Sequence, residues 1–221
     1  MIAVVFALEF EAADFVASSA RRLCVDVWRL GVTGHRAASA FERELAIARP
    51  SLVVSAGFCG ALQPGISVGE VFVGGNYTSP GLLRIAAEFP GIRVGELVCV
   101  PHVLETGESK SRLGRSSGAT IADMETAHLF DICVQKRIPF LSLRAVSDVC
   151  EEDLPVPGDV LIDPQTGRPA PAILFRHMLK NPKAAFGLNR LIGNSKLARA
   201  NLSAALQEIT PRLLRVEHDR E

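Results

Sequence analysis

The chain has 221 residues, which is enough for one domain with a substantial core, or for one domain with an appendage. Its 24 basic and 24 acidic residues give no net charge, so the composition provides no electrostatic argument for binding nucleic acid. Five cysteines without CxxC or CxxH spacing indicate no metal site. The apolar start has no basic residues and is followed at once by Glu9 and Glu11, and no apolar run is long enough to span a membrane, so we expect a cytoplasmic protein.

The chain is predicted to begin with a buried strand. Residues 2–8 form a continuous apolar run of strand length, and helix-favouring residues follow over 12–20. Glu9 and Glu11 lie between them, at a strand-to-helix corner. Two interpretations remain open from these residues alone. The carboxylates are either solvated groups that complement the helix dipole, or members of a site.

The next elements are predicted from alternation and from turn residues. Residues 22–32 predict a strand around Trp28, residues 37–48 a helix closed by Pro50, and residues 51–55 a second buried strand. A small-residue turn over 56–62 follows, and Gly57 and Gly60 in it would let the backbone approach a ligand closely. A hairpin is expected over 64–73 and a strand over 97–100.

Residues 105–118 are rich in Ser, Gly and Arg, and they predict a polar loop suited to act as a lid. Two further stretches carry acidic residues. Ala122–His128 predicts a strand end turning into a helix, with Asp123 as the helix cap and Glu125 close behind it. A buried parallel strand over 138–146 then delivers Ser147 and Asp148 at its carboxyl end, where open α/β sheets bind ligands.

Taken in this order, the motifs resemble those of the superfamily of purine nucleoside phosphorylases and methylthioadenosine/adenosylhomocysteine nucleosidases. The resemblance covers residues 1 to about 153, which we take as one nucleosidase-like domain, with residues 154–221 as a connector and C-terminal helices. It implies an α/β fold, a three-layer αβα arrangement with a twisted mixed central sheet, plus a C-terminal helical extension.

The resemblance also implies cleavage of the N-glycosidic bond of a purine nucleoside. Carried over position by position, Asp148 would protonate N7 of the purine and Glu11 would orient the attacking water. Glu125 would hold the ribose 2'- and 3'-hydroxyls, Met124 would pack on the sugar, and Ser147 would fix the Asp148 carboxyl by a hydrogen bond. An oxocarbenium-like sugar needs anionic neighbours and a departing base needs a proton, so two carboxylates suit this chemistry.

The sequence departs from the family in the small-residue turn. Phe58 stands where the family has a ligand-facing serine, and Ser55 stands where hexameric phosphorylases carry an arginine. Arginine grips phosphate through a bidentate fork, so its loss favours water over phosphate as the nucleophile. No cofactor is expected, and phosphate remains the alternative co-substrate. Phe58 would contact a bulky apolar substituent of the substrate or pack within the turn.

The C-terminal third is predicted to contain two helices over 172–206, broken at Asn181-Pro182. Between Pro164 and Ala200 there are seven Lys or Arg residues and no Asp or Glu, with large apolar residues interleaved. This pattern has two interpretations. It is typical of a basic amphipathic surface that contacts a membrane, and equally of helices packed on a sheet or at a subunit interface.

This tail is similar to that of hopanoid-associated nucleoside phosphorylase-like proteins, which are implied to release adenine from adenosylhopane. The resemblance therefore implies a lipid-linked purine nucleoside as substrate and peripheral contact with the inner membrane surface. We also expect a homo-oligomer. The alternatives are a nucleosidase for methylthioadenosine, adenosylhomocysteine or futalosine, a phosphate-dependent phosphorylase, and a non-catalytic nucleoside-binding scaffold at a membrane. Retention of both Glu11 and Asp148 argues against the scaffold.

Overall fold

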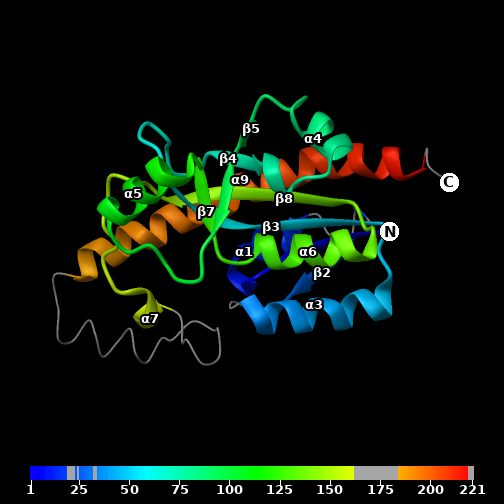
Figure 1. Cartoon of the computed structure of the whole chain (residues 1–221), viewed down its shortest axis with the longest axis horizontal. Coiled ribbons are helices and arrows are strands. Elements are labelled where there is room, and N and C mark those ends of the chain that lie inside the picture. The colour runs from blue at the N-terminus through cyan, green and yellow to red at the C-terminus, as the bar shows by residue number, and fades with distance from the viewer. Residues whose placement is uncertain (19–22, 24, 32–33, 162–183, 219–221) are drawn as a thin grey trace.

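The fold is a twisted sheet with helices on both faces (Figure 1). The computed structural model describes residues 1–18, 23, 25–31, 34–161 and 184–218. Its strands are β1 (Ile2–Phe6), β2 (Asp26–Arg29), β3 (Leu52–Ala61), β4 (Val71–Gly74), β5 (Ile92–Gly95), β6 (Leu97–Cys99), β7 (Ile121–Asp123) and β8 (Phe140–Asp148). Together these strands form one sheet in the order β2-β1-β3-β8-β4-β5, while β7 pairs with both β3 and β6.

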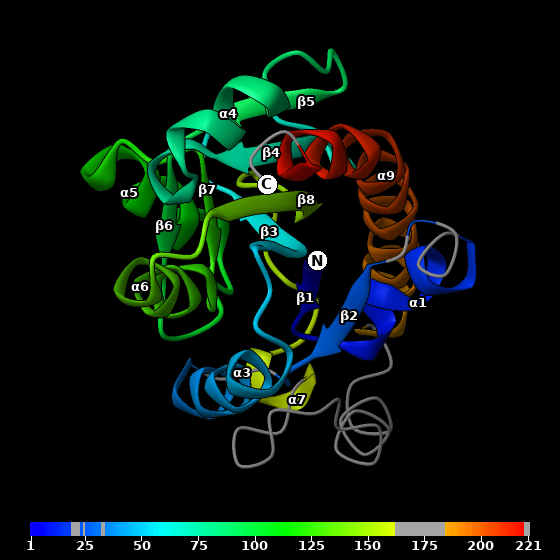
Figure 2. The same ribbon diagram turned by 90° about the vertical axis from the view of Figure 1, so that its right-hand side faces the viewer.

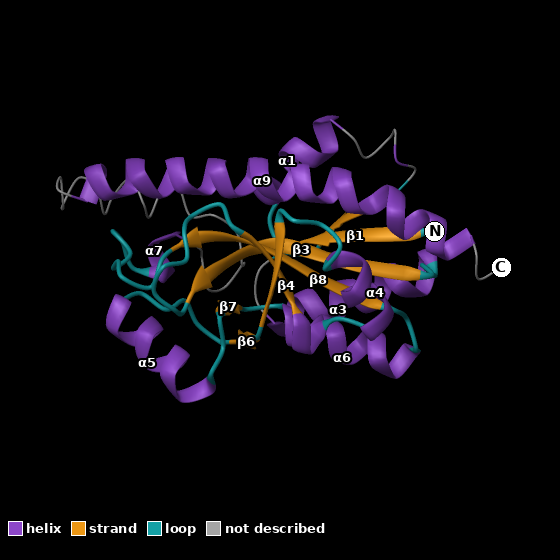
Figure 3. Cartoon of the chain, turned by 90° about the horizontal axis from the view of Figure 1, so that it is seen from above, coloured by secondary structure: helices purple, strands orange, loops and turns teal. Residues whose placement is uncertain are grey.

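The helices lie in two layers, one on each face of the sheet. Helices α1 (Glu9–Ser18), α4 (Pro80–Ala86) and α9 (Ala184–His218) cover one face, and α3 (Gly34–Ala48) and α6 (Thr126–Lys136) cover the other (Figures 2 and 3). The remaining helical segments are the 3-10 turn η1 (Gly75–Tyr77), α5 (Gly107–Ser117) and α7 (Gly158–Leu161).

The alternation of side chains in β1 explains why both faces are covered. Ile2, Val4 and Phe6 pack toward α1 and α9, whereas Ala3 and Val5 pack toward α3 and α6. A strand that is apolar on both faces must be buried on both. Strand β8 runs parallel to β3 and antiparallel to β4, so the sheet is mixed. The expected three-layer αβα fold with a C-terminal helix is thus confirmed.

Strand β3 is longer than the sequence predicted. It spans Leu52–Ala61, so the segment 56–62 that was expected to form a turn is mostly strand. Glycines normally weaken a strand, but here they make room for neighbouring side chains. A Cβ atom on Gly57 would lie 3.0 Å from Oε1 of Glu11, and one on Gly60 would lie 3.1 Å from Oδ1 of Asp148.

Two further local predictions were wrong. The expected hairpin over 64–73 does not form, because β4 pairs with β8 and β5 rather than with β3. The expected loop over 105–118 is helix α5. Thr106 caps its first turn in a reciprocal arrangement with Ser109, and Gly118 ends it in the left-handed conformation at φ 73°. The local capping residues outweigh the polar composition that suggested a loop.

Helix α9 differs from the predicted tail. It runs from Ala184 to His218, beyond the expected end at Leu206, while the predicted break at Asn181-Pro182 lies outside the described residues. One side of the helix is buried against β8, β3 and α1, through Ala198, Leu202, Leu206, Ile209 and Leu213. The described part of the tail therefore packs on the sheet. In the portion of the chain that the structure describes, no helix is both long and apolar enough to cross a membrane.

Candidate active site

A cavity of about 310 Å³ opens beside the carboxyl ends of β1, β3 and β8. Seven of the eight residues that the sequence singled out line it: Glu11, Phe58, Gly60, Met124, Glu125, Ser147 and Asp148. The eighth, Gly57, lines a much smaller adjoining pocket of about 10 Å³ together with Glu11, Phe58 and Glu125. The fold thus gathers residues separated by more than a hundred positions around one cavity.

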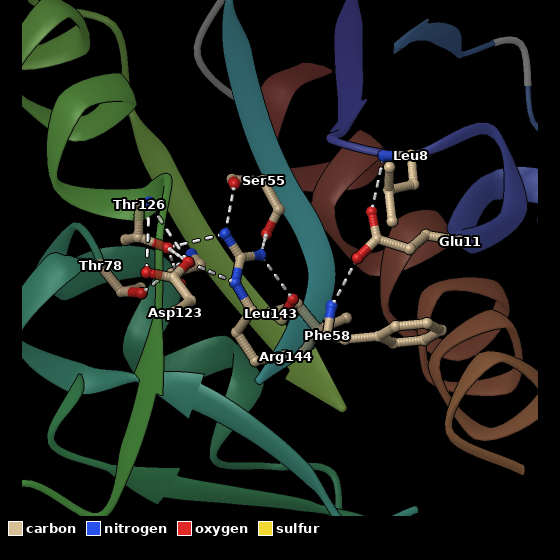
Figure 4. A network of polar contacts seen from close by, with 10 residues as sticks. Leu8, Glu11, Ser55, Phe58, Thr78, Asp123, Thr126, Leu143 and Arg144 are labelled. Atoms are coloured by element: carbon tan, nitrogen blue, oxygen red, sulfur yellow. Dashed lines mark hydrogen bonds and ion pairs between the residues drawn. The ribbon is translucent and has the colours of Figure 1, made fainter. Parts of the chain in front are cut away.

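Glu11 is held at the corner between β1 and α1. Its Oε2 accepts the N–H of Leu8 at 2.8 Å, and its Oε1 accepts the N–H of Phe58 at 2.9 Å (Figure 4). The residue is 5% exposed, so it is not a solvated first-turn carboxylate. That description fits Glu9, whose side chain is 76% exposed and pairs with Arg29 at 2.9 Å.

Two acidic groups in the site favour their protonated forms more than usual. Burial raises the pKa of Glu11 above its ordinary value. Burial, followed by the negative charges of Asp123 and Glu11, raises the pKa of Glu125 to about 8. Carboxyl groups with raised pKa values can exchange protons near neutral pH, which is a property that acid–base catalysis requires.

The raised pKa of Glu125 predicts a pH-dependent stability. Between the ordinary carboxyl pKa near 4.5 and about 8, the unfolded chain has released this proton while the folded chain retains it. The free energy of unfolding should therefore fall as pH rises through this window. We expect Glu125→Gln to remove this component and to stabilise the protein at pH 8 by on the order of 4 kcal/mol. Urea denaturation at pH 5, 6, 7 and 8 checks this, and equal slopes in both proteins would contradict it.

Asp148 lies at a register irregularity between β8 and β3. Cys59 pairs with Val146 but Gly60 pairs with Asp148, so Ser147 is an extra residue in β8. Such a bulge redirects the side chains beside it. The Ser147 hydroxyl donates to Oδ2 of Asp148 at 2.9 Å, the geometry that the sequence analysis expected for this pair.

Lys110 also lines the cavity, and sequence analysis missed it. Its Nζ lies 2.5 Å from Oδ1 of Asp148, and its side chain is 1% exposed. It projects from α5, the segment that was mistaken for a loop. The sequence does contain a signal for the helix, because Thr106 and Ser109 form a capping pair at its start and Gly118 ends it. This signal would have predicted the helix but not the ion pair.

Arg144 is a second group that sequence analysis did not assign to the site. Its Nε donates to Asp123 at 2.8 Å (Figure 4). Its Nη1 donates to the carbonyl oxygens of Ser55 at 2.8 Å and Leu143 at 2.9 Å. Its Nη2 donates to the hydroxyl oxygens of Ser55 at 2.8 Å and Thr126 at 2.7 Å. All five N–H groups of the guanidinium are therefore used. The sequence signal that could have identified Arg144 was its position within the apolar run of a buried strand.

This network gives the two carboxylates that flank Met124, Asp123 and Glu125, different environments. Asp123 is buried, accepts the N–H of Thr126 at 3.2 Å and is neutralised by Arg144. The prediction that Asp123 caps the helix was wrong, because Glu125 occupies the N-cap position of α6. It is part of a structural ion pair. Glu125 has no such partner among the described residues and lines the cavity. The two acids thus have different environments although one residue separates them.

The wall of the cavity near α1 and α9 is apolar. The rings of Phe10 and Phe58 meet edge to face, with centroids 6.3 Å apart. Further apolar residues line the same cavity: Val100, Val103, Leu104, Leu154 and Leu191. Within the described ranges, no group of three or more His, Cys, Asp or Glu side chains is arranged to hold a metal ion.

Comparisons with known proteins show which family model and which solved structures the chain is similar to. Residues 75–168 match a sequence model of the phosphorylase superfamily. The described residues have the nucleoside phosphorylase-like fold, in which a mixed sheet is flanked by helices and followed by a long C-terminal helix.

Individual solved structures share this fold over nearly the whole chain. A putative 5'-methylthioadenosine/S-adenosylhomocysteine nucleosidase from Francisella philomiragia is 15% identical, with a TM-score of 0.69 over 96% of this chain and 98% of that one. The corresponding nucleosidase from Neisseria meningitidis, in complex with methylthio-immucillin-A, is 19% identical, with a TM-score of 0.67 over 94% and 97%. A futalosine hydrolase mutant from Helicobacter pylori is 12% identical, with a TM-score of 0.66 over 94% and 98%.

At these identities the similarity to solved structures establishes the fold. A comparison with curated proteins found no match.

Proposed function

We propose that the protein is a purine nucleosidase, which cleaves the N-glycosidic bond of a 5'-substituted purine nucleoside by hydrolysis and releases the base. The observation that carries this proposal is the convergence of Glu11, Glu125 and Asp148 on one cavity at the carboxyl ends of the strands. The solved structures with this fold include nucleosidases and a hydrolase of nucleosides, one of them in complex with a nucleoside analogue.

Each carboxylate has a distinct part in the proposed reaction. Asp148 protonates N7 of the departing purine, and Glu11 orients the attacking water and accepts its proton. Glu125 accepts hydrogen bonds from the ribose 2'- and 3'-hydroxyls, and Met124 packs on the sugar. The negative charge of the Glu11 carboxylate stabilises the oxocarbenium-like sugar while the C1'–N9 bond breaks. Ser147 keeps the Asp148 carboxyl oriented through its 2.9 Å hydrogen bond.

The environment of Arg144 supports water as the nucleophile. It lies against Ser55, the residue that replaces the phosphate-binding arginine of hexameric phosphorylases, but its N–H groups are already bound to protein acceptors. A phosphate ion would have to break that network to gain a bidentate arginine. Phe58, which stands in place of the ligand-facing serine, presents an apolar ring to the cavity.

We therefore expect base release that does not depend on phosphate. The product is the free 5'-substituted ribose rather than its 1-phosphate, and product analysis by mass spectrometry in phosphate-free buffer and in 50 mM phosphate distinguishes the two. A strict requirement for phosphate, with formation of the 1-phosphate, would contradict hydrolysis and favour the phosphorylase alternative.

The apolar wall supports a nucleoside with a large apolar 5'-substituent, and we propose adenosylhopane as the substrate. Phe10 and Phe58, with the leucines and valines beside them, offer a surface on which burial of hydrocarbon is favourable. A small 5'-group such as methylthio would leave much of this wall in contact with water. The proposal places the reaction in the formation of hopanoid lipids.

A substrate panel tests the proposal and its alternatives. Purified protein is incubated with adenosylhopane, methylthioadenosine, adenosylhomocysteine, futalosine and inosine, and free base is followed by chromatography. We expect the highest kcat/KM with adenosylhopane. A preference for methylthioadenosine, adenosylhomocysteine or futalosine would support a small-substrate nucleosidase. Binding of nucleosides without release of base from any of them would support the non-catalytic scaffold.

We further propose peripheral contact with anionic membranes through the basic tail. Seven positive charges lie between Pro164 and Ala200 without a negative one. Arg190 and Arg199 pair with Glu152 and Asp14, and each of the other charges should attract anionic lipid by about 1 kcal/mol when it is near the surface. Two apolar residues of α9, Ile192 and Leu197, are 43% and 49% exposed. We expect binding to anionic vesicles at low salt that fades as salt screens the charges.

Co-sedimentation with anionic and neutral vesicles measures this binding. Replacement of Arg176, Lys180 and Lys183 by glutamate should reduce it while activity on a water-soluble adenosine analogue persists. Unchanged binding in that variant, or no binding by the intact protein, would contradict membrane contact. The expected homo-oligomer stays a prediction, which sedimentation equilibrium checks.

A further inference from the structure

Lys110 is a buried cation to which the proposed mechanism gives no part. Helix α5 holds it firmly, because α5 approaches β3 so closely that a Cβ atom on Gly114 would lie 2.3 Å from the carbonyl oxygen of Leu62. At the other end of the helix, a Cβ atom on Gly107 would lie 2.7 Å from the carbonyl oxygen of Cys150. The first contact holds the helix that carries the lysine against the residue that follows β3, and the second holds it against the segment that follows β8.

The ammonium group of Lys110 has three hydrogens and three protein acceptors. Its Nζ lies 2.5 Å from Oδ1 of Asp148, 3.1 Å from the carbonyl oxygen of Val149 and 3.2 Å from that of Glu152. No hydrogen is left for a ligand. Lys110 therefore acts on the site through Asp148, which lines the cavity and carries the other end of the ion pair.

Lys110 and Asp148 meet as an ion pair of an ammonium and a carboxylate. A carboxylate has no proton to donate. A departing purine nevertheless needs a proton at this position. We infer that Lys110 supplies the proton that Asp148 passes to the leaving base, so that the two residues form one acid. This inference rests on the proposed nucleosidase function. The hydrogen bond between Nζ and Oδ1 is the path for the first transfer.

All protons and electrons of the proposed hydrolysis are accounted for with water as the only co-reactant. The C1'–N9 bond breaks and its electron pair goes to the purine. N7 takes a proton from Asp148 as Asp148 takes one from Nζ of Lys110, which becomes a neutral amine. Water adds its hydroxyl to C1' and gives its proton to Glu11. That proton then leaves for solvent, and Lys110 is reprotonated from solvent.

The other ionisable groups around this pair are engaged elsewhere. The carboxylate of Glu152 pairs with Arg190 at 3.0 Å, and Asp153 accepts the N–H of Gly107 at 2.8 Å. Glu151 accepts the N–H of Gly65 at 3.2 Å. Glu11 lines the same cavity, held by the hydrogen bonds already described, and Cys59 is a buried thiol whose pKa burial raises. Among the described carboxylates, Asp148 is the one that forms an ion pair with Lys110.

Chemical rescue distinguishes a proton donor from a group that only holds Asp148 in place. We expect Lys110→Ala to lower kcat about 100-fold at pH 7, the scale of a lost general acid. Added methylammonium should restore part of the activity, because it can both enter the vacated space and release a proton. Guanidinium has the same charge but holds its protons too tightly, and should not restore it. Lys136→Ala, which removes an exposed lysine at the end of α6, is the matched control and should behave as wild type.

Lys110→Arg provides an independent measurement should the alanine variant not fold. It keeps a positive charge beside Asp148, and we expect kcat to be lowered at pH 7 and to rise toward lower pH, where the carboxyl group takes its proton from water. A wild-type pH profile in Lys110→Arg, or equal rescue of Lys110→Ala by guanidinium, would overturn the inference and leave the nucleosidase proposal standing. If the wild-type protein releases no base from any nucleoside, the proposed function fails and the inference falls with it.

Discussion

Asp148→Asn is expected to lower turnover by about 100-fold or more while the protein remains folded. The asparagine side chain has nearly the same shape, and its oxygen can still accept a hydrogen bond from Lys110 or Ser147. It cannot pass a proton to N7 of the purine. Because the substrate contacts that we propose for Glu125 and the apolar wall would be retained, we expect the loss in kcat, with KM little changed.

Base release measured under single-turnover conditions reports this loss without interference from product release. Asp131→Asn provides the control, because Asp131 is an exposed residue on α6, outside the cavity. A thermal melt of both variants verifies that they are folded. Wild-type-like turnover in Asp148→Asn would remove Asp148 from the mechanism, and with it the part that we assign to Lys110.

Arg144→Leu is expected to destabilise the protein by about 3–5 kcal/mol, the scale for breaking a buried ion pair from one side. The side chain of Arg144 is 3% exposed and that of Asp123 is 1% exposed. Removing the guanidinium leaves a buried carboxylate without its counter-ion, and it removes hydrogen bonds from Ser55 and Thr126. Unfolding by urea, monitored by circular dichroism, measures the difference in free energy.

Two comparisons identify the cause of that loss. Arg112→Leu breaks an exposed ion pair with Glu108 and should change stability by well under about 1 kcal/mol. The double variant Arg144→Leu with Asp123→Leu removes both charges, so it should be more stable than Arg144→Leu alone. A loss below about 1 kcal/mol in the single variant would show that the network contributes little to stability.

Most of the fold and many of the candidate site residues could be predicted from local patterns. The apolar runs of β1 and β8 and the turn residues around α6 are set by neighbours in the chain, because burial and capping act over a few residues. Short motifs at strand ends identified Glu11, Glu125, Ser147 and Asp148, since parallel strands bring their carboxyl ends to one edge. The errors arose where local signals conflicted, as in the glycine-containing end of β3 and the polar residues of α5.

The sequence by itself thus determined the layers of this protein, the acids at the ends of its strands and the basic character of its tail. Only the tertiary structure decided which charges meet. The pairing of Lys110 with Asp148, and of Arg144 with Asp123 and Ser55, joins residues that are 21 to 89 positions apart. No local pattern encodes such contacts, because they depend on how the helix and strand layers pack. Those contacts give the carboxylates of Asp148, Asp123 and Glu125 their different environments.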